Sequence, residues 1–342
     1  MLDDLKLIHE RDPQDAVGVA GKQWEFLSRD FDVHFTPKGD IANVVIAGMG
    51  GSGWPAFTLG SWPRLKVPFQ VVSNYVLPDY VNEKTLVISS SYSGNTEETL
   101  SDLEDAEKRG AQIAVVASGG KLADAARQKN LPLFALQAGI QPRMATLFFL
   151  NAYVKILSQA GLTVESPEEL ADAGEWLHQE FASLGVEVPT SKNLAKQIAL
   201  ELVGKTIIVY SGPLLYPAAH KWKICMNENA KNTAWDAYYP EFNHNEFIGW
   251  SGQPLDKPFS VVEIRSNLEL PRTQKRFEVS ERLLSGKRPA PIVVQPHGDT
   301  LLKQLLWSIA MGDFVSVYLA ILNNVNPTPV DLVEKFKVEL DK

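Results

Sequence analysis

The chain has 342 residues, and its formal net charge of −8 argues against general binding to nucleic acid or to an anionic membrane, which requires clustered cations. Hydrophobic residues make up 45% of the chain and charged residues 22%, as in ordinary globular proteins, and the length fits two domains. The single cysteine, Cys225, excludes a disulfide framework, and an acidic N-terminus without an apolar signal core predicts a soluble, cytoplasmic protein with no membrane span.

Short apolar segments rich in β-branched residues alternate with amphipathic segments through the first half of the chain. Apolar runs of this length are typical of strands that are buried on both faces. Between them, Leu100, Leu103 and Ala106 recur at helical spacing within 96–109. The alternation predicts a parallel, doubly wound sheet. Its predicted strands are 43–47, 69–73, 85–89, 112–116 and 131–135.

A second unit of the same kind follows a polar, Glu-rich segment. That segment, 166–184, has a helical pattern and is predicted to connect the two units. Strands are then predicted at 206–210, 259–264 and 291–295, and helices at 301–322 and 331–340. The predicted fold class is α/β, with two doubly wound parallel-sheet domains in tandem, a connecting helix and a C-terminal helix. The expected boundaries are 1–160, 161–190 and 191–342.

A glycine cluster follows the first predicted strand. Gly48, Gly50 and Gly53 match the dinucleotide-binding pattern G-x-G-x-x-G, in which the backbone approaches a pyrophosphate at a helix N-terminus. That pattern also needs an acidic residue about 20 residues later to hold the ribose, and none ends the next predicted strand. The cluster therefore has two alternatives to a dinucleotide site, namely a strand-to-helix turn without a ligand and a site for a phosphate group, and the phosphate site is favoured.

Four serines within five residues lie at the end of the third predicted strand and directly after it, in the segment 89–99. One interpretation is helix capping, with Asn95 as the N-cap and Glu98 closing a capping box. Capping does not need so many hydroxyl groups, whereas hydroxyl and amide groups at a helix N-terminus can bind one phosphate. Because the loop has no Lys or Arg, the pattern favours a phosphomonoester over a nucleoside triphosphate.

Three motifs in this half together resemble the sugar isomerase (SIS) domain, which binds phosphosugars through Ser and Thr side chains. The motifs are 50–53 (Gly-Gly-Ser-Gly), 91–96 (Ser-Tyr-Ser-Gly-Asn-Thr) and 118–120 (Ser-Gly-Gly). The resemblance implies that this half of the chain holds the phosphate of the substrate. The substrate-binding residues implied are Gly51, Ser52, Ser91, Ser93 and Thr96.

Three polar residues elsewhere are candidates for chemistry. Glu228 lies one turn beyond Cys225 on an amphipathic helix, where a carboxylate in a partly dry pocket can act as a base. His244 lies in a turn-rich segment, and Arg143 follows the fifth predicted strand. Taken singly, each has an ordinary alternative: a surface helix carboxylate, a structural histidine and a surface ion-pair partner.

In their order along the chain, these residues and their neighbours resemble the bifunctional phosphoglucose/phosphomannose isomerase family, a branch of the phosphoglucose isomerases with two SIS domains. The motifs are 141–143 (Gln-Pro-Arg), 227–231 (Asn-Glu-Asn-Ala-Lys), 240–245 (Pro-Glu-Phe-Asn-His-Asn) and 326–329 (Asn-Pro-Thr-Pro). The resemblance implies reversible isomerisation of glucose 6-phosphate, and of mannose 6-phosphate, to fructose 6-phosphate.

The resemblance also implies roles for residues of the site. Thr328 is linked to acceptance of the mannose epimer. A lysine seven residues later assists ring opening, and the nearby Lys337 is the alternative to it. The catalytic residues implied are the base Glu228, the enediolate-stabilising Arg143, and the ring-opening pair His244 and Lys335.

The implied chemistry suits these residue types. Aldose–ketose isomerisation moves a proton between C1 and C2 through a cis-enediolate, so it needs one base that takes and returns the proton. A fixed guanidinium can stabilise the enediolate oxygens, and imidazole can shuttle protons during ring opening. No redox cofactor is required, and the six histidines form no metal-binding motif, so neither a cofactor nor a metal is expected.

A homodimer is the expected assembly. The resemblance implies that one histidine, His244 by position, acts in the active site of the neighbouring subunit. The segment 235–250 also carries six large aromatic residues, which favour an interface. The alternative is that these aromatic side chains pack within the chain's own second domain.

Other functions within the SIS group are alternatives to an isomerase. A phosphosugar-binding sensor without catalysis stays open, because binding motifs do not prove turnover. A transcription regulator would need a basic helix-turn-helix unit, and the first 40 residues show none. An amidotransferase would need an N-terminal nucleophilic cysteine, whereas the only cysteine lies at position 225.

Overall fold

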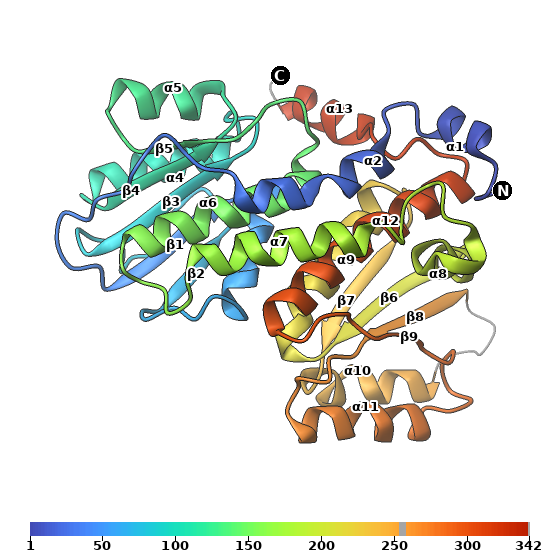
Figure 1. Ribbon diagram of the computed structural model, residues 1–342. Helices are drawn as coiled ribbons and strands as arrows, with labels where there is room; N and C mark the ends of the chain where they lie inside the picture. The colour runs from blue at the N-terminus through green and yellow to red at the C-terminus, as the bar shows by residue number, and fades with distance from the viewer. Residues whose placement is uncertain (253–257, 341–342) are drawn as a thin grey trace. The chain divides into compact units, whose positions relative to one another are not determined.

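The computed structural model describes residues 1–252 and 258–340, and the chain forms two compact units. The first unit contains residues 22–178, and the second contains 1–21 together with 179–342. Each unit is built on one sheet in which neighbouring strands run parallel, with helices on both faces (Figure 1). The expected α/β fold class with two parallel-sheet domains is confirmed.

The strands of the first unit are β1 (Asn43–Gly48), β2 (Phe69–Val72), β3 (Thr85–Ser91), β4 (Gln112–Ala117) and β5 (Leu133–Ala135). Their order in the sheet is β2-β1-β3-β4-β5, so β2 lies on one side of β1 and β3 on the other. The direction of winding therefore reverses between β1 and β3. Open parallel sheets bind ligands at the carboxyl ends of the two strands that flank such a switch point.

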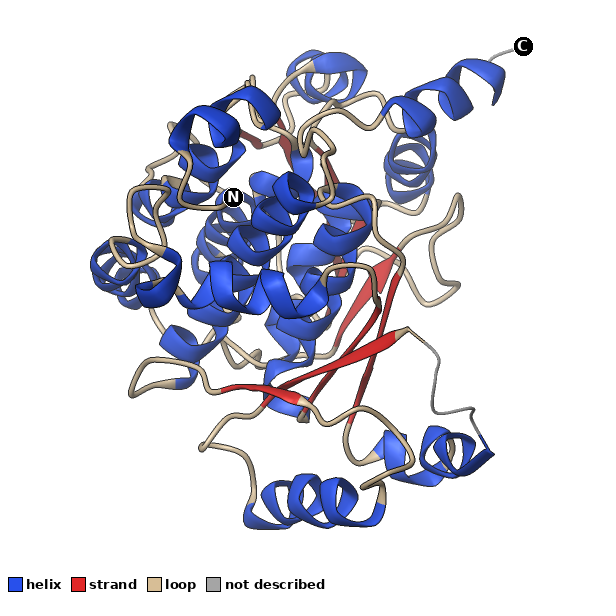
Figure 2. Cartoon of the chain, turned by 90° about the vertical axis from the view of Figure 1, so that its right-hand side faces the viewer, coloured by secondary structure: helices blue, strands red, loops and turns tan. Residues whose placement is uncertain are grey.

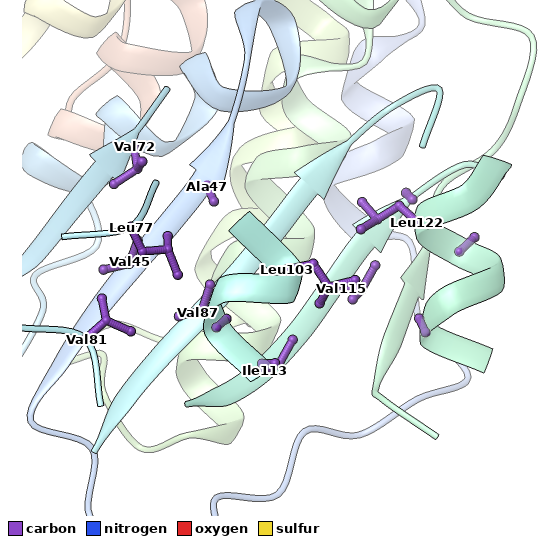
Figure 3. Packing of buried hydrophobic residues seen from close by; sticks show 14 residues of the cluster. Val45, Ala47, Val72, Leu77, Val81, Val87, Leu103, Ile113, Val115 and Leu122 are labelled. Carbon is purple, nitrogen blue, oxygen red and sulfur yellow. The ribbon is translucent and has the colours of Figure 1, made fainter. Parts of the chain in front are cut away.

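The helices that cover this sheet are α4 (Glu97–Lys108), α5 (Gly120–Gln128) and α6 (Thr146–Gln159). On one face, Leu103 of α4 packs with Val87 and Val115 in a single hydrophobic core (Figure 3). On the other face, the Ser90 hydroxyl lies 2.6 Å from the Tyr153 hydroxyl of α6. All of β3 is buried, as expected for a strand that is covered on both faces.

The strands of the second unit are β6 (Thr206–Ser211), β7 (Ala234–Tyr238), β8 (Phe259–Ile264) and β9 (Ile292–Val294), in the order β7-β6-β8-β9. Of these, β7 is absent from the predicted strands. One layer of helices lies against one face of this sheet, and α11 lies against the other (Figures 1 and 2). The helices in chain order are α1 (Leu5–Arg11), α2 (Ala16–Gly21), α8 (Leu194–Leu202), α9 (Tyr216–Glu228), α10 (Glu246–Gly249), α11 (Pro271–Leu283) and α12 (Leu301–Leu322).

Helix α12 forms the centre of the second unit. By length and composition it would suit a membrane span, but 94% of its most apolar 18-residue window is buried inside the fold, so it is a core helix. It packs closely on α9, where a Cβ on Gly312 would come within 2.4 Å of the Trp222 ring.

The terminal helix α13 (Asp331–Leu340) is exposed at every residue. Both α12 and α13 have the bounds expected from the sequence. The predicted connecting segment holds α7 (Pro167–Phe181).

The aromatic segment 235–250 packs largely into its own unit. Tyr239 and Phe242 are completely buried, and Trp250 is nearly so, in a cluster with Phe277 of α11. Trp235 is the exception, with 55% of its surface exposed. Tyr239, Phe242 and Trp250 therefore pack within their own unit, which is the alternative that the sequence analysis left open. These three residues give no support to an interface.

Helix α4 carries a buried carboxyl group. Asp102 is 1% exposed, and neither of its carboxylate oxygens has a hydrogen-bond partner in the described part of the chain. Burial, with smaller contributions from Asp105 and Glu98, raises its pKa to about 7. An Asp side chain in an unfolded chain titrates near pH 4, so the folded state holds this proton over about three pH units in which the unfolded state has lost it.

We expect Asp102 to make the protein less stable at pH 8 than at pH 5. Its contribution is fully present below about pH 4 and is lost as the pH rises through about 7, which corresponds to about 2–3 kcal/mol between pH 5 and pH 8. Asp102→Asn should abolish this part of the pH dependence in urea unfolding. Glu104→Gln, an exposed change on the same helix, should leave it intact. An equally steep loss of stability in Asp102→Asn would contradict the assignment.

Candidate active site

Glycines at the carboxyl end of β1 allow backbone segments to pack against one another. The turn after β1 contains the short helix α3 (Gly50–Gly53). A Cβ on Gly51 would lie 2.8 Å from the backbone nitrogen of Arg143, and a Cβ on Gly53 would lie 2.2 Å from the carbonyl oxygen of Gly48. Both distances are shorter than a side chain allows, so this packing requires glycine.

The hydroxyl groups expected to bind phosphate lie at the ends of β1 and β3. The Ser52 hydroxyl accepts the backbone N–H of Tyr92 at 2.9 Å. The Ser91 hydroxyl lies 2.8 Å from the Thr96 hydroxyl. Ser93 is exposed on the same loop. The structure therefore brings these predicted residues together at the switch point of the first unit.

Helix α4 does not begin with a capping box. Its N-cap is Thr96, and the Thr96 side chain makes no capping hydrogen bond. Asn95 instead accepts the backbone N–H of Lys121 at 3.1 Å, and Glu98 is the second residue of the helix rather than the third. The capping-box interpretation of Asn95 and Glu98 is therefore wrong. A helix N-terminus without a side-chain cap retains amide groups that can donate to a phosphate.

The loop after β4 packs tightly against this serine loop. Gly94 and Gly120 both have left-handed backbone conformations, with φ of 69° and 70°. A Cβ on Gly94 would meet the carbonyl oxygen of Gly119, and one on Gly120 would come within 2.3 Å of the carbonyl oxygen of Ser93. The Ser118 hydroxyl donates to the backbone of the serine loop at 2.5 Å. The loop is therefore held in one conformation before any ligand arrives.

Arg143 is fixed in the same unit. The Tyr92 hydroxyl donates to the carbonyl oxygen of Gln137 and accepts the N–H of Ile140, both at 2.8 Å, which holds the segment that leads to Arg143. Arg143 is only 2% exposed, and its guanidinium donates to the side-chain oxygen of Gln141 at 3.2 Å. A buried guanidinium that is held in this way is oriented before an anion binds.

In the second unit, a carboxylate occupies the place where the first unit has its serine loop. The strand order reverses between β6 and β8. Glu269 follows β8 and accepts the backbone N–H of Leu214, which follows β6, at 2.9 Å. A Cβ on Gly212 would come within 2.1 Å of the same carboxylate. Burial raises the pKa of Glu269. The second switch point is therefore filled by a side chain of the protein.

Glu228 is the last residue of α9. Polar side chains within this helix and directly after it form buried hydrogen bonds with α12. Lys221 donates to the Asp313 carboxylate at 2.8 Å, and Asn229 donates to the Ser316 hydroxyl at 2.9 Å. These contacts fix both the axis and the rotation of α9. Glu228 itself is half-buried, as the sequence expectation of a partly dry position requires.

Lys231 connects the end of α9 to the segment that contains Thr328. Its ammonium group donates to the carbonyl oxygens of Glu228 at 2.8 Å and of Pro327 at 3.2 Å. Its backbone has a φ of 51°, a left-handed conformation that is unfavourable for a residue with a side chain. Lys231 thus links the end of α9 to the Thr328 segment. The sequence places Lys231 in a motif but does not predict this link, because the link depends on the backbone conformation of Lys231 and on its contact with Pro327.

His244 and Lys335 lie apart from Glu228 in the contacts of the second unit. His244 ends the short helix Glu241–His244, is exposed, and makes no hydrogen bond to Glu228 in the described structure. That helix packs through Phe242 with α11, on the sheet face opposite α9 (Figure 1). Lys335 is exposed on α13. The structure therefore places both residues without joining them to the base.

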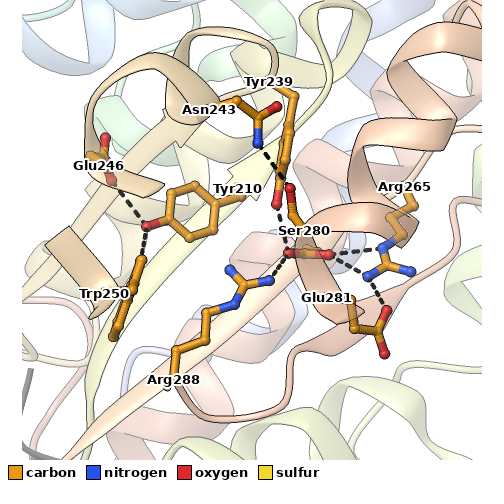
Figure 4. Close-up of polar contacts among 10 residues, drawn as sticks. Tyr210, Tyr239, Asn243, Glu246, Trp250, Arg265, Ser280, Glu281 and Arg288 are labelled. Atoms are coloured by element: carbon orange, nitrogen blue, oxygen red, sulfur yellow. Dashed lines mark hydrogen bonds and ion pairs between the residues drawn. The ribbon is translucent and has the colours of Figure 1, made fainter. Parts of the chain in front are cut away.

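Glu246 is the other carboxylate close to His244 in the sequence. It accepts a hydrogen bond from the Tyr210 hydroxyl at 3.0 Å (Figure 4). Desolvation raises the pKa of Glu246.

The described structure shows no grouping of side chains that could hold a metal ion. Within residues 1–252 and 258–340, no three His, Cys, Asp or Glu side chains come together in this way.

Comparison with known proteins identifies the family. The family model of the bacterial phospho-glucose isomerase C-terminal SIS domain matches residues 191–340. The chain is 34% identical to the bifunctional phosphoglucose/phosphomannose isomerase of Aquifex aeolicus (strain VF5) over 323 residues, which cover 94% of this chain and 95% of the relative. It is also 31% identical to the D-glucosamine-6-phosphate 4-epimerase of Sulfolobus acidocaldarius over 295 residues, which cover 86% and 88%.

A solved structure shares the fold. The glucose-6-phosphate isomerase like protein from Thermus thermophilus superposes with a TM-score of 0.66 and 18% identity, and the match covers 98% of both chains. This likeness shows that the two proteins have the same fold. On the 34% identity that extends over nearly its whole length, the chain belongs to the bifunctional phosphoglucose/phosphomannose isomerase family.

Proposed function

We propose that the protein is a sugar-phosphate isomerase that interconverts glucose 6-phosphate and mannose 6-phosphate with fructose 6-phosphate. The observation that carries this proposal is the 34% identity to an isomerase of that name over 94% of the chain. The serine loop at the switch point of the first unit supports a phosphorylated substrate. We further propose that it works in the cytoplasm.

The phosphate of the sugar is bound by hydroxyl and amide groups. Ser91 and Thr96 already lie within hydrogen-bond distance of each other, and the glycines of the neighbouring loop hold the serine loop in place. The uncapped N-terminus of α4 adds backbone donors. Gly51, Ser52 and Ser93 complete the set. A phosphate held by this loop restricts the motion of the sugar and so favours proton transfer between C1 and C2.

The proton chemistry is assigned to residues of the family motifs. Glu228 takes the proton from one carbon and returns it to the other, and Arg143 stabilises the enediolate oxygens between the two transfers. His244 and Lys335 assist ring opening, with Lys337 as the alternative lysine. Thr328 contacts the epimeric C2 hydroxyl region and permits the mannose substrate. No cofactor or metal takes part.

The active assembly is a homodimer in which His244 serves the neighbouring subunit. Its exposure and its position on the sheet face opposite α9 support a role outside the site of its own chain. A subunit alone would then lack one of its ring-opening groups.

A second candidate activity follows from the epimerase relative. That protein is named a D-glucosamine-6-phosphate 4-epimerase and is 31% identical to this chain. Epimerisation at C4 would leave fructose 6-phosphate unconverted to glucose 6-phosphate. Formation of glucose 6-phosphate from fructose 6-phosphate, followed with an NADP-linked dehydrogenase, therefore separates the isomerase from the epimerase and from a non-catalytic sensor.

We expect Glu228→Gln to lower kcat at least about 100-fold with KM changed only a fewfold, because the substitution removes the base and keeps the shape. The dehydrogenase assay should show this with fructose 6-phosphate. It should also show it with mannose 6-phosphate, which reaches glucose 6-phosphate only through both activities. The matched control is Glu246→Gln, which should stay near wild type. Wild-type protein that is inert on both sugars would overturn the proposed function, and a loss in Glu246→Gln alone would move the base to Glu246.

Mixing two inactive variants tests the role of His244 in the partner's site. After exchange of subunits, a heterodimer of Glu228→Gln and His244→Ala should hold one site with both defects and one with neither. About half of the mixed dimers' sites should then regain activity in the same assay. If verified exchange restores none, His244 acts within its own chain or outside the site.

We expect Lys231→Gly to separate stability from activity. Glycine relieves the left-handed strain at this position, so the thermal midpoint should stay close to that of the wild type. Loss of the contacts from Lys231 to the carbonyl oxygens of Glu228, Asn229 and Pro327 should release the Glu228 end of α9 from the Thr328 segment and lower kcat about tenfold. Lys231→Arg should recover part of the rate. A fall in activity that only follows a fall in thermal midpoint would mean that Lys231 is merely structural.

A further inference from the structure

The first half of α11 carries three cations that line one cavity. Arg272, Lys275 and Arg276 border a space of about 230 Å³. No acidic side chain is among the residues that line it. This concentration of positive charge contrasts with the net charge of −8 of the whole chain. The remaining lining residues are Asn243, Phe247, Val279 and Ser280.

The charges of these three cations repel one another. They are spaced three and four residues apart, so like charges face one another along the helix. They also lie toward the positive end of the helix dipole, and the first turn of α11 has no acidic residue. The corresponding helix of the first unit, α4, has Glu97 and Glu98 in its first turn. An anion in the cavity would remove this repulsion.

Only part of this charge is neutralised by the protein. Lys275 pairs with Glu278 at 2.7 Å, but both side chains are well exposed, and such a pair contributes little. Arg272 is exposed and makes no hydrogen bond or ion pair in the described part of the chain. One strong donor group therefore remains available at the edge of the cavity.

Hydrogen bonds order part of the cavity lining. The Arg276 guanidinium donates to the side-chain oxygen of Asn243 at 3.1 Å. Figure 4 shows the next contact, in which the Asn243 amide donates to the Ser280 hydroxyl at 2.9 Å. Ser280 is 1% exposed, so this chain of contacts is held by the core. Phe247 and Val279 supply an apolar surface beside it. A lining that combines cations with apolar carbon suits a phosphate group on a short carbon skeleton.

From this geometry we infer that the cavity between α11 and the segment around Asn243 binds a small phosphate-bearing metabolite, at a site separate from the serine loop of the first unit. Asn243 directly precedes His244 in the sequence. Binding there restrains the residue beside His244 and so changes turnover. This effect on turnover rests on the proposed role of His244, whereas binding itself does not.

Calorimetric titration with inorganic phosphate tests the site, because the two expected sites can be removed separately. Wild-type protein should bind two phosphates per chain, and Arg272→Ala/Lys275→Ala should lose one of them or weaken it at least about tenfold. Ser52→Ala/Ser91→Ala should lose the other. Arg282→Ala, an exposed cation in the last turn of α11, is the matched control and should still bind two.

The two losses have different meanings. Unchanged binding in Arg272→Ala/Lys275→Ala would overturn the site on α11, whereas unchanged binding in Ser52→Ala/Ser91→Ala would overturn the phosphate assignment of the proposed function. If the α11 double variant changes the oligomeric state in sedimentation, the cations bind a second copy of the chain, and the metabolite site is overturned.

A stability measurement gives an independent readout. Without phosphate, Arg272→Glu should raise the thermal midpoint by about 1–2 °C, because it removes a repulsion and complements the helix dipole. The same variant should lose the stabilisation by phosphate that the Arg282→Ala control retains. At saturating sugar phosphate, added phosphate should alter kcat in the wild type and not in Arg272→Ala/Lys275→Ala. A midpoint that falls in Arg272→Glu, or a kcat response that persists in the double variant, would contradict the inference.

Discussion

The buried ion pair between Lys221 and Asp313 fixes how α9 packs on α12 in the second unit. Both side chains are completely or almost completely buried. Burial opposes the charged form of the lysine, yet the neighbouring Asp313 carboxylate holds the pKa of Lys221 above its ordinary value. The Cys225 thiol donates to the same carboxylate at 3.0 Å. A buried pair of this kind contributes little net stability, but loss of one partner leaves an uncompensated charge, so the pair specifies a single packing of α9 on α12.

That packing determines where the chemistry at the end of α9 can take place. The helix cannot slide or rotate without separating Lys221 from Asp313, and the Trp222 ring lies against Gly312, where no larger residue fits. Lys231 then extends the constraint from the helix end to the tail around Thr328. The Lys221–Asp313 pair and the contact at Gly312 fix the position of α9, and Lys231 fixes its end. Together these contacts determine the position of the Glu228 carboxylate.

The two units use the same sheet topology for different purposes. In the first unit, glycines bring loops so close that hydroxyl groups and helix amides meet at the switch point. In the second unit, the Glu269 carboxylate binds the N–H of Leu214 at the switch point. The fold provides an anion-binding position in both cases. Sequence differences of a few residues decide whether that position is open to a ligand.

Sequence patterns predicted the strands and helices that carry a continuous apolar or β-branched run, and they missed β7 and α11, which carry none. All of β3 is buried, and its apolar run was recognisable, as was the apolar helix α12. Strand β7 has only one fully buried residue, and its sequence, Ala-Trp-Asp-Ala-Tyr, contains no β-branched residue. Helix α11 is polar apart from a narrow buried stripe. Neither element produces the periodicity from which the others were inferred.

The site shows the same division. Hydroxyl groups clustered in a loop after a strand predicted a phosphate site, because the chemistry is visible in the residue types. The N-cap was misassigned to Asn95 because the contact between Thr96 and Ser91 depends on how the loop folds back on itself. The cavity on α11 depends on Asn243, which precedes α11 by almost 30 residues in the sequence, so helix spacing alone does not reveal it.

The division of the chain into units also imposes an order on its synthesis. The first unit is one continuous stretch, so all of its strands have emerged from the ribosome once residue 178 has been added and extruded. The second unit combines residues 1–21 with the C-terminal half, and its central helix ends only at Leu322. Its N-terminal segment must wait unpacked while the first unit folds. Because the sheet from β6 to β9 lacks its apolar core helix until Leu322 has left the ribosome, the nascent second unit exposes apolar surface for longer than the first unit does.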